Sequence, residues 1–325
     1  GGESATLTDA NLILGYLDPG FFLGGTMTLN KEATHETTKD NLAQPLNLST
    51  TRTAWGIHET ASEDIARAFR IHAAERGFDY RGATMIAFGG SGPLHAMSVA
   101  TKLKIPRVVF PIGAGVYSAL GLLASPLSFE LSRSRRVILE DIDEKVFCGH
   151  FLPLIEETSH SLKEAGVEDG QISITCQLEA RYFGQTHEIV VVLPNNNLTE
   201  LFSDVRSLFE KRYSEVYSFA AIDAPIEIIN WKVIASGTEP VFKMSYGLQV
   251  DDKQKSNPVK GKREVYIGPS GYELAPVYDR YLLSKGMEIN GPAIIEERES
   301  TCFITPGSRA VVDQSSNVVA ELDVF

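Results

Sequence analysis

One stretch of the chain decides the fold: TMIAFGGSGPLHA, which covers residues 84–96. Its first five residues form a largely apolar run of strand length, and three glycines follow within four residues. Pro93 then suits the first position of a helix, because its missing N–H would have no partner there anyway. The stretch predicts a buried strand, a glycine turn and a helix.

The segments on either side continue this alternation. Apolar residues recur at three and four from residue 57 to residue 72 and predict an amphipathic helix that ends at Gly77. Residues 107–110 predict a second buried strand, and the small-residue segment 113–123 predicts a helix. Nearer the start, Thr8 is a candidate N-cap for a short helix over residues 9–17. Strands that alternate with helices predict an α/β layered domain.

From Ser128 the pattern changes to longer strands with partial alternation. Periodicity and length predict strands and long helices in this order: a helix at 143–166, strands at 172–182 and 187–192, a helix at 198–216 and a strand at 226–235. The charged segment 251–262 predicts an exposed connection, and the chain beyond it is rich in strand patterns. We therefore predict two domains, residues 1–126 and a mixed α+β, β-rich domain over residues 127–325.

Composition excludes several classes of function. The formal charge of −12, a pI near 5.1 and the lack of a basic stripe argue against nucleic acid as a partner. No run approaches the roughly 20 apolar residues of a membrane span, and the start resembles no signal peptide, so we expect no membrane association and a cytoplasmic protein. The three cysteines form no C-x-x-C pair and suggest neither a disulfide framework nor a zinc site. The chain opens on Gly1-Gly2 without an initiator Met, and we expect a fragment.

The glycine turn could hold a phosphate or a ribose. Three glycines between a strand and a helix let a ligand approach the backbone without obstruction by side chains. A helix N-terminus carries about half a positive charge and several unpaired N–H groups, which favour an anion. Residues 89–92 match neither G-x-G-x-x-G nor the Walker pattern, which disfavours those two nucleotide folds. A tight strand-to-helix connection without a ligand explains the local pattern equally well.

The segment AFGGSGPLHA, residues 87–96, resembles the signature of the hydantoinase A and 5-oxoprolinase family. Other segments are similar to the family in order and spacing, so that the resemblance covers nearly the whole chain: TDANLILGYLDP, EDIARAFRIHAAERG, GVYSALGLLASP, RYFGQTHEI, DAPIEIIN and NGPAIIEERESTCFITPG. The resemblance implies an α/β fold, the second half of an actin-like ATPase core, followed by the mixed α+β, β-rich domain. In the superfamily of actin, sugar kinases and heat-shock ATPases, two such subdomains enclose ATP and Mg²⁺.

In that plan, residues 88–92 look like the motif on the adenosine side of the nucleotide. The family's first phosphate motif, Asp-x-Gly-Gly-Thr, is absent from this chain, and the tripeptide at residues 24–26 is preceded by Phe22 and Leu23 instead of the expected Asp. The nucleotide site of this chain is therefore expected to be incomplete, and we expect weak or no ATP hydrolysis by the chain alone.

The resemblance also implies a reaction, the ATP-driven opening of a cyclic amide such as 5-oxoproline or a hydantoin, and a hydantoinase B-like partner subunit or domain. An unstrained lactam is a poor electrophile, and phosphorylation of its amide oxygen would create a better leaving group; such transfer depends mostly on positioning and charge neutralisation. Two alternatives remain open: the ATP-binding subunit of an acetone or acetophenone type of carboxylase, and a non-catalytic module for subunit assembly.

Asp9 and His95 are the candidate catalytic residues. His95 falls in the first turn of the helix that faces the expected nucleotide, and an ordinary imidazole pKa of about 6.5 suits contact with a phosphate or a water. Asp9 could serve as a carboxylate on the metal or water side. Each also has a structural explanation, His95 as a hydrogen-bonded core histidine and Asp9 as an acidic residue at a helix start. No metal ligand is assigned, and the candidate nucleotide-binding residues are Gly89, Gly90, Ser91 and Gly92.

Three further groups have mainly structural interpretations. The polar residues Arg181, Gln185 and His187 flank Gly184 and are expected to form an interdomain hydrogen-bond network. The charge run at residues 296–299 is typical of a solvated face. Cys302 stands beside two apolar residues and is expected to be an inert buried thiol.

Overall fold

The computed structural model describes residues 2–218, 224–241 and 257–322. Contacts divide the chain into two compact units, the first formed by Gly1–Gly121 with Ser245–Phe325 and the second by Leu122–Met244. This division differs from the predicted domains 1–126 and 127–325. The last strands of the chain belong with the N-terminal part because they complete its sheet, a pairing between distant segments that local sequence patterns do not reveal.

Unit 1 combines helices with two sheets. Its helices are α1 (Leu7–Ile13), α2 (Lys31–Thr38), α3 (Thr50–Glu75), α4 (Gly92–Leu103) and the beginning of α5 (Tyr117–Ala124). Its strands are β1 (Thr84–Ile86), β2 (Arg107–Phe110), β7 (Val259–Tyr266), β8 (Tyr272–Asp279), β9 (Glu288–Asn290), β10 (Ala293–Glu296), β11 (Thr301–Ile304), β12 (Arg309–Val312) and β13 (Val318–Glu321).

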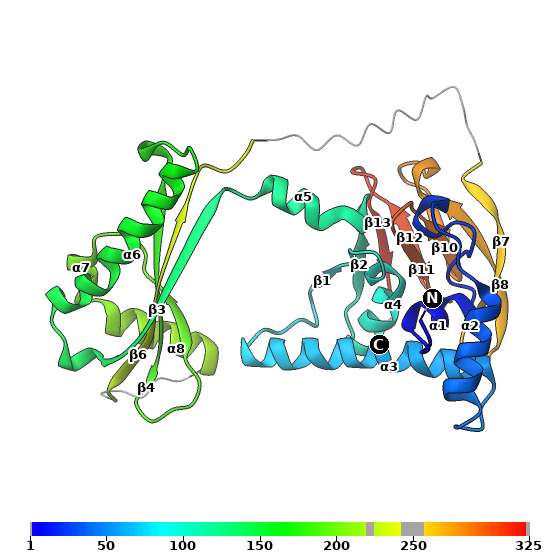
Figure 1. Ribbon diagram of the computed structural model, residues 1–325, viewed down its shortest axis with the longest axis horizontal. Helices are drawn as coiled ribbons and strands as arrows, with labels where there is room; N and C mark the ends of the chain where they lie inside the picture. The colour runs from blue at the N-terminus through cyan, green and yellow to red at the C-terminus, as the bar shows by residue number, and fades with distance from the viewer. Residues whose placement is uncertain (1, 219–223, 242–256, 323–325) are drawn as a thin grey trace. The chain divides into compact units, whose positions relative to one another are not determined.

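The two sheets of unit 1 join early and late parts of the chain (Figure 1). One sheet has the order β1-β2-β13-β12-β9; β1 runs parallel to β2, and β13 lies antiparallel to β2 with Val319 opposite Val109. The other sheet has the order β11-β10-β8-β7, with β8 and β10 parallel. The predicted α/β character is confirmed to the extent that helices pack with mixed sheets in this unit.

Helix α4 connects the cores of the two sheets. Met97, Ala100 and Leu103 belong to the core of the five-stranded sheet, whereas Leu94 belongs to the core that contains α1, β8 and β10. The helix ends at Lys104, whose φ of 56° lies in the left-handed region that terminates helices. Because both cores fix α4, the position of its N-terminus is fixed as well.

Several predicted elements of unit 1 differ in detail from the structure, and α1, for example, ends at Ile13 and not at residue 17. The strand expected to be buried, β1, has only three residues and lies at a sheet edge, so that Ile86 is 56% and Phe88 48% exposed. Helix α3 begins at Thr50, several residues before the predicted start, because the side chain of Ser49 accepts a hydrogen bond from the Arg52 N–H. Strand β2 is formed over the predicted residues.

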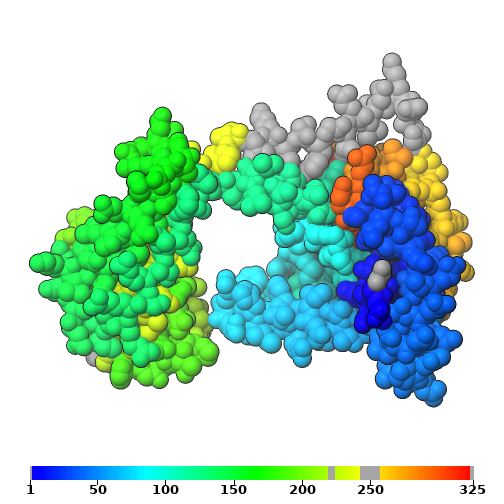
Figure 2. Space-filling view, viewed as in Figure 1, coloured from blue at the N-terminus to red at the C-terminus, as the bar shows by residue number. Residues whose placement is uncertain are grey.

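The N-terminal segment packs against the strands β7 and β8. The Tyr16 hydroxyl donates to the Tyr266 carbonyl at 2.7 Å, and the Tyr272 hydroxyl donates to the Ile13 carbonyl at 3.1 Å. Figure 2 shows the N-terminal residues in blue beside these C-terminal strands in yellow and orange. These contacts bring residues from opposite ends of the chain into one compact unit.

Unit 2 is a four-stranded antiparallel sheet with helices on one face. Its elements are β3 (Ser128–Ile138), α6 (Glu144–Glu164), β4 (Ser173–Tyr182), β5 (Ile189–Val192), α7 (Leu198–Phe202), α8 (Val205–Tyr217) and β6 (Ile226–Ser236), with sheet order β3-β6-β4-β5. Alternate residues of β4 are buried with Trp231 in a core shared by α6, α7 and α8. The predicted helix at 198–216 is interrupted, because Ser203 and Asp204 separate α7 from α8.

Three other sequence predictions can be compared with the structure. Of the predicted connection at 251–262, residues 251–256 lie outside the described residues, and β7 begins at Val259. Within the described residues, no helix is both long and apolar enough to cross a membrane. Cys302 is buried, and burial raises the pKa of its thiol to about 12, which favours the expected inert thiol.

Candidate functional site

The glycine turn between β1 and α4 is open on one side. Gly89 has a φ of 90° and donates its N–H to the Ala114 carbonyl at 2.8 Å, which anchors the turn to the segment after β2. A Cβ added at Gly89 or Gly92 would meet nothing within 4 Å. Ser91, at the helix start, makes no side-chain capping bond. The backbone at the N-terminus of α4 is therefore accessible to a ligand.

The turn lines the wall of a cleft of about 230 Å³. Segments that are distant in the sequence converge there: α1, the loop that follows it, the start of α4 and the β10–β11 hairpin. The lining residues are Thr8, Asn11, Leu17, Asp18, Phe21, Phe22, Leu23, Gly90, Ser91, Leu94, Glu296, Glu297, Arg298, Glu299, Ser300 and Thr301. Of the predicted nucleotide-binding residues, Gly90 and Ser91 line this cleft. Gly92 lines a neighbouring hollow together with Phe88 and His95, and Gly89 lines neither.

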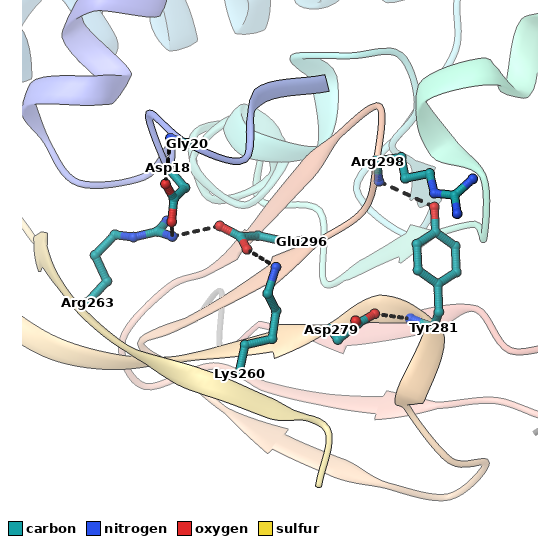
Figure 3. Close-up of polar contacts among 8 residues, drawn as sticks. All are labelled: Asp18, Gly20, Lys260, Arg263, Asp279, Tyr281, Glu296 and Arg298. Carbon is teal, nitrogen blue, oxygen red and sulfur yellow. Dashed lines mark hydrogen bonds and ion pairs between the residues drawn. The ribbon is translucent and has the colours of Figure 1, made fainter. Parts of the chain in front are cut away.

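Asp18 and Glu296, which line the cleft, belong to a network of charges that Figure 3 shows. Arg263 lies between Asp18 and Glu296, with its Nη2 atom 2.9 Å from the Asp18 carboxylate and 2.7 Å from that of Glu296. Lys260 binds the other Glu296 oxygen at 2.7 Å and lies 3.4 Å above the centre of the Phe21 ring. The network holds the loop after α1 against β7 and β10.

A second buried carboxylate, Glu297, supports the adjacent wall. It accepts hydrogen bonds from the backbone N–H of Gly113 at 2.9 Å and of Ala114 at 3.2 Å. The side chain of Arg280, which is 1% exposed, lies 3.4 Å from the same carboxylate. Glu296 and Glu297 are thus buried, and the prediction of a solvated face was wrong for both. Cations from distant segments neutralise these charges, which a local charge pattern cannot indicate.

Arg298 and Glu299 form the exposed tip of the β10–β11 hairpin, as the prediction had it. The Arg298 N–H donates to the Tyr281 hydroxyl at 3.3 Å (Figure 3). Within the described ranges, neither Arg298 nor Glu299 forms an ion pair, whereas the other cleft carboxylates, Asp18, Glu296 and Glu297, each contact a cation. The cleft walls therefore carry nearly balanced charge.

His95 belongs to a buried polar cluster behind the cleft. Its Nε2 lies 3.2 Å from the Asn11 amide nitrogen and its Nδ1 lies 3.2 Å from the Ser62 hydroxyl. The Asn11 carbonyl oxygen in turn faces His58 Nδ1 at 3.0 Å. If the Asn11 amide donates to His95 Nε2, the His95 proton resides on Nδ1 and points to Ser62. Both nitrogens of His95 are then hydrogen-bonded, through Asn11 and Ser62, and His58 is hydrogen-bonded to Asn11 through its Nδ1.

Burial keeps both histidines neutral. Desolvation lowers the pKa of His95 to about 4, and desolvation followed by the neighbouring His95 lowers the pKa of His58 to about 3. A neutral His95 that already has two partners is a positioning group for Asn11, which lines the cleft. A direct catalytic role for His95 stays a prediction that this geometry does not favour.

Asp9 acts as a helix-capping residue. Its Oδ2 accepts from the Thr6 backbone N–H at 2.9 Å and from the Thr6 hydroxyl at 2.6 Å, and its Oδ1 accepts from the Thr34 hydroxyl at 2.8 Å. The N-cap is thus Thr6 and not the predicted Thr8. Asp9 is not among the cleft residues, and its carboxylate is occupied by these three donors. A catalytic role for Asp9 also stays a prediction.

The polar residues predicted to form an interdomain network make their contacts inside unit 2. Arg181 on β4 donates to the Glu227 carboxylate on β6 at 2.9 Å, and the Gln185 side chain donates to the Tyr213 hydroxyl at 2.7 Å. His187 is exposed. No group of three or more His, Cys, Asp or Glu side chains is placed to hold a metal ion in the parts of the chain that the structure describes.

Sequence patterns alone did not identify Asn11 and Asp18 as cleft residues, or Arg263 as the partner of Asp18. For Asn11 a signal was available, since an amide within the buried run from Ala10 to Ile13 must find a partner. For Asp18 and Arg263 no local signal exists, because 245 positions of sequence separate the two partners.

Comparisons with known proteins cover nearly the whole chain. Residues 1–130 match the family model described as Hydantoinase/oxoprolinase, and residues 145–318 match the Hydantoinase/oxoprolinase C-terminal domain. An uncharacterized protein of Methanocaldococcus jannaschii is 35% identical over 97% of this chain and 44% of its own length. The caprolactamase alpha subunit of Pseudomonas jessenii is 29% identical over 97% of this chain and 46% of its own.

Two further comparisons bear on function. The acetophenone carboxylase gamma subunit of Aromatoleum aromaticum is 29% identical over 99% of this chain and 45% of its own length. Among solved structures, the ATP-dependent caprolactamase from Pseudomonas jessenii superposes with a TM-score of 0.73 at 27% identity, covering 97% of this chain and 46% of that one. The chain thus spans about half the length of these relatives.

Proposed function

Because the chain belongs to the hydantoinase/oxoprolinase family, we propose that it forms part of an ATP-dependent enzyme that opens cyclic amides, and that the cleft beside residues 89–92 contributes to its nucleotide site. One observation carries this proposal: the glycine turn exposes its backbone at the N-terminus of α4, in the wall of a cleft. The similarity to an ATP-dependent caprolactamase supports it.

The residues around the turn fit a nucleotide. At the start of α4, Pro93 has no N–H and the Leu94 N–H donates to the Ser91 carbonyl at 3.1 Å. The backbone donors that the turn can offer are therefore those of Gly90, Ser91 and Gly92, which are exposed. Open space at Gly92, in the neighbouring hollow, leaves room beside the helix start that a side chain would otherwise fill. The backbone of this turn would therefore hold the ligand, with Leu94 and Phe22 as apolar neighbours in the cleft.

The charge balance of the cleft indicates which part of the nucleotide it takes. Asp18, Glu296 and Glu297 are each paired with cations, which leaves Arg298 and Glu299 as the unpaired charges among the described lining residues. A nearly neutral cleft suits an uncharged base and ribose better than a triphosphate, which needs an excess of positive charge. We therefore assign the nucleoside to this cleft, in agreement with the adenosine-side interpretation of residues 88–92.

ATP, when bound, supplies a phosphoryl group that can activate the oxygen of a stable amide. The contribution of this chain is to bind and orient: the turn offers backbone donors, and Asn11 is held at the cleft wall by His58 and His95. Mg²⁺ is proposed only as the usual companion of ATP. We assign no ligand for it, since no metal-binding cluster is present within the described residues.

Binding and turnover test the proposal separately. Titration of Mg-ATP into the chain should give saturable binding, and adenosine should compete with ATP because the cleft takes the nucleoside. We expect weak or no ATP hydrolysis by the chain alone, because it lacks an Asp-x-Gly-Gly-Thr motif. Absence of binding by both the chain and the complete protein would leave the module for subunit assembly as the better explanation.

The substrate and the partner are proposed from the relatives. A cyclic amide, such as 5-oxoproline, a hydantoin or a larger lactam, is the proposed substrate, and a hydantoinase B-like subunit or domain is the proposed partner, because the caprolactamase relative is named as an alpha subunit. The complete protein should release phosphate in the presence of such amides and not of ketones.

The second candidate function is the ATP-binding subunit of a carboxylase, which the 29% identity to an acetophenone carboxylase subunit favours. Phosphate release by the complete protein with its partner would decide between the two. Release stimulated by a ketone and dependent on bicarbonate would favour the carboxylase, whereas release stimulated by a lactam without bicarbonate would favour the hydrolase.

A further inference from the structure

The buried carboxylate of Glu297 is connected to the glycine turn through a single residue, Ala114. The Ala114 N–H donates to Glu297 Oε2 at 3.2 Å, and the Ala114 carbonyl accepts the N–H of Gly89 at 2.8 Å. Ala114 is fully buried, so no water competes for either bond. A displacement of the Glu297 side chain would therefore move Ala114, whose carbonyl accepts the hydrogen bond from the glycine turn.

The carboxylate is held firmly on its other side. Ser300 donates its hydroxyl to Oε2 at 3.1 Å, and Arg280 Nε lies 3.4 Å from Oε1. Arg280 also donates to the carbonyl of Phe110 at 2.9 Å and to that of Ser316 at 3.0 Å, which fixes the guanidinium at the end of β2. These contacts hold the Glu297 side chain in place independently of the glycine turn. The position of Glu297 therefore determines that of the turn, and not the reverse.

The backbone of the β10–β11 hairpin lies in close contact with the backbone of the segment that carries Ala114. A Cβ added at Gly115 would lie 2.7 Å from the Glu299 carbonyl oxygen, closer than side-chain carbons approach in proteins. Glycine at this position lets the hairpin tip rest directly on the segment that carries Ala114. The hairpin and that segment therefore form one rigid support behind Gly89.

We propose that Glu297 is a positioning residue, which sets the placement of the turn at residues 89–92 by holding Gly113 and Ala114. A carboxylate suits this task because it only accepts hydrogen bonds, and two backbone N–H groups point at it. The amide of a glutamine would place a donor against one of these N–H groups and remove the charge that pairs with Arg280. The importance of the turn for nucleotide binding rests on the proposed function, but the mechanical connection does not.

A purely structural role would make a different prediction. If Glu297 only stabilised the core of unit 1, its loss would lower the stability of the whole unit without a specific effect at the turn. A positioning role requires a local change at residues 89–92 in protein that remains folded. Hydrogen–deuterium exchange by mass spectrometry reads this change directly, because the Gly89 N–H is protected by its bond to Ala114.

The test compares Glu297→Gln with a matched control, Glu227→Gln. Glu227 is also buried and paired with arginines, Arg136 at 3.1 Å and Arg181 at 2.8 Å, but it lies in unit 2. We expect Glu297→Gln to raise hydrogen–deuterium exchange in peptides that cover residues 86–92 and 113–116. We also expect it to weaken ATP binding by roughly tenfold, which corresponds to the loss of about one charge-assisted hydrogen bond. Glu227→Gln should change exchange only in unit 2 and leave ATP affinity unchanged.

The outcomes separate this proposal from the proposed function. Unchanged exchange at residues 86–92 in folded Glu297→Gln would overturn the positioning role, as would an equal loss of ATP affinity in Glu227→Gln. Altered exchange at the turn, in a protein whose wild type binds no ATP, would support the positioning role and count against the nucleotide site. If Glu297→Gln does not fold, Ser300→Ala removes one of the bonds to Glu297 and should raise exchange at the same peptides to a smaller extent.

Discussion

His58 and His95 stack on each other in the interior of unit 1, with ring centroids 4.4 Å apart and planes inclined by 24°. They come from different helices, α3 and α4, and share Asn11 as a hydrogen-bond partner. Both rings must stay uncharged, because burial opposes protonation and a charge on one ring would repel a charge on the other. The contact makes the stability of unit 1 dependent on pH.

We predict that the protein loses stability as the pH falls from about 6.5 toward about 4. Burial lowers the pKa of His95 to about 4 and that of His58 to about 3, both below the unfolded value, so protons bind the unfolded state first. The stabilisation is complete above the unfolded pKa and is lost as the pH approaches the folded values, at roughly 1.4 kcal/mol for each unit of pKa difference. Urea unfolding between pH 8 and pH 4.5 measures the loss.

The control for this prediction exchanges one histidine at a time. His95→Asn should flatten the pH dependence of the unfolding free energy, whereas His160→Asn, at a position that is 70% exposed on α6, should leave the slope unchanged. An equally steep curve in His95→Asn would show that other groups cause the acid sensitivity.

We predict that Gly90→Val abolishes or strongly weakens ATP binding while the fold persists. An added Cβ at Gly90 would lie 3.5 Å from the Glu299 carbonyl oxygen, an ordinary contact, so the first carbon fits and the methyl groups occupy the cleft. Calorimetric titration with ATP measures the effect. Gly149→Val on α6, where an added Cβ meets nothing within 4 Å, is the matched control and should bind ATP as the wild type does. Unchanged affinity in Gly90→Val would mean that no ligand approaches the turn.

Local chemistry was enough to predict the part of the fold that bears the glycine turn. The apolar run, the glycines and Pro93 act within a few residues of each other, and helix α4 and strand β2 lie where their patterns indicate. The family resemblance carried by residues 87–96 is confirmed by the two family models. The burial of Glu296 was not predictable, because its partners Lys260 and Arg263 lie 36 and 33 positions away.

The contact-based division of the chain differs from the predicted domains for the same physical reason. Strand β13 completes a sheet begun by β1 and β2, so residues near the end of the chain join unit 1. A strand pattern shows that a segment can pair, but it does not show with which other strand. The partner is selected by hydrophobic burial between segments that lie far apart in the sequence. Asp9 shows a second limit of sequence patterns. An aspartate is a residue type that suits catalysis, and only the positions of Thr6 and Thr34 in the structure show that its carboxylate oxygens already accept hydrogen bonds.

We predict that removal of the buried carboxylate at position 296 costs far more stability than removal of an exposed one. Glu296→Leu leaves Lys260 and Arg263 without their shared partner in a site where the carboxylate is 2% exposed, and should lower the unfolding free energy by about 3–5 kcal/mol. Asp64→Ala breaks the exposed pair with Arg67 and should cost less than about 1 kcal/mol. Urea unfolding at constant pH compares the two variants, and similar losses would contradict the role assigned to the buried network.

The contact of Gly115 with the hairpin tip leads to the last prediction. Gly115→Ala should destabilise unit 1 by about 1–3 kcal/mol, because the new Cβ would lie 2.7 Å from the Glu299 carbonyl oxygen and 2.8 Å from its carbon, so backbone must move. Gly82→Ala, where an added Cβ meets nothing within 4 Å, should leave stability nearly unchanged. Thermal unfolding measures both variants. This contact joins the hairpin tip to the segment that holds Gly89, so Gly115→Ala should also weaken ATP binding. Full ATP affinity in a destabilised variant would show that the cleft tolerates movement of the hairpin.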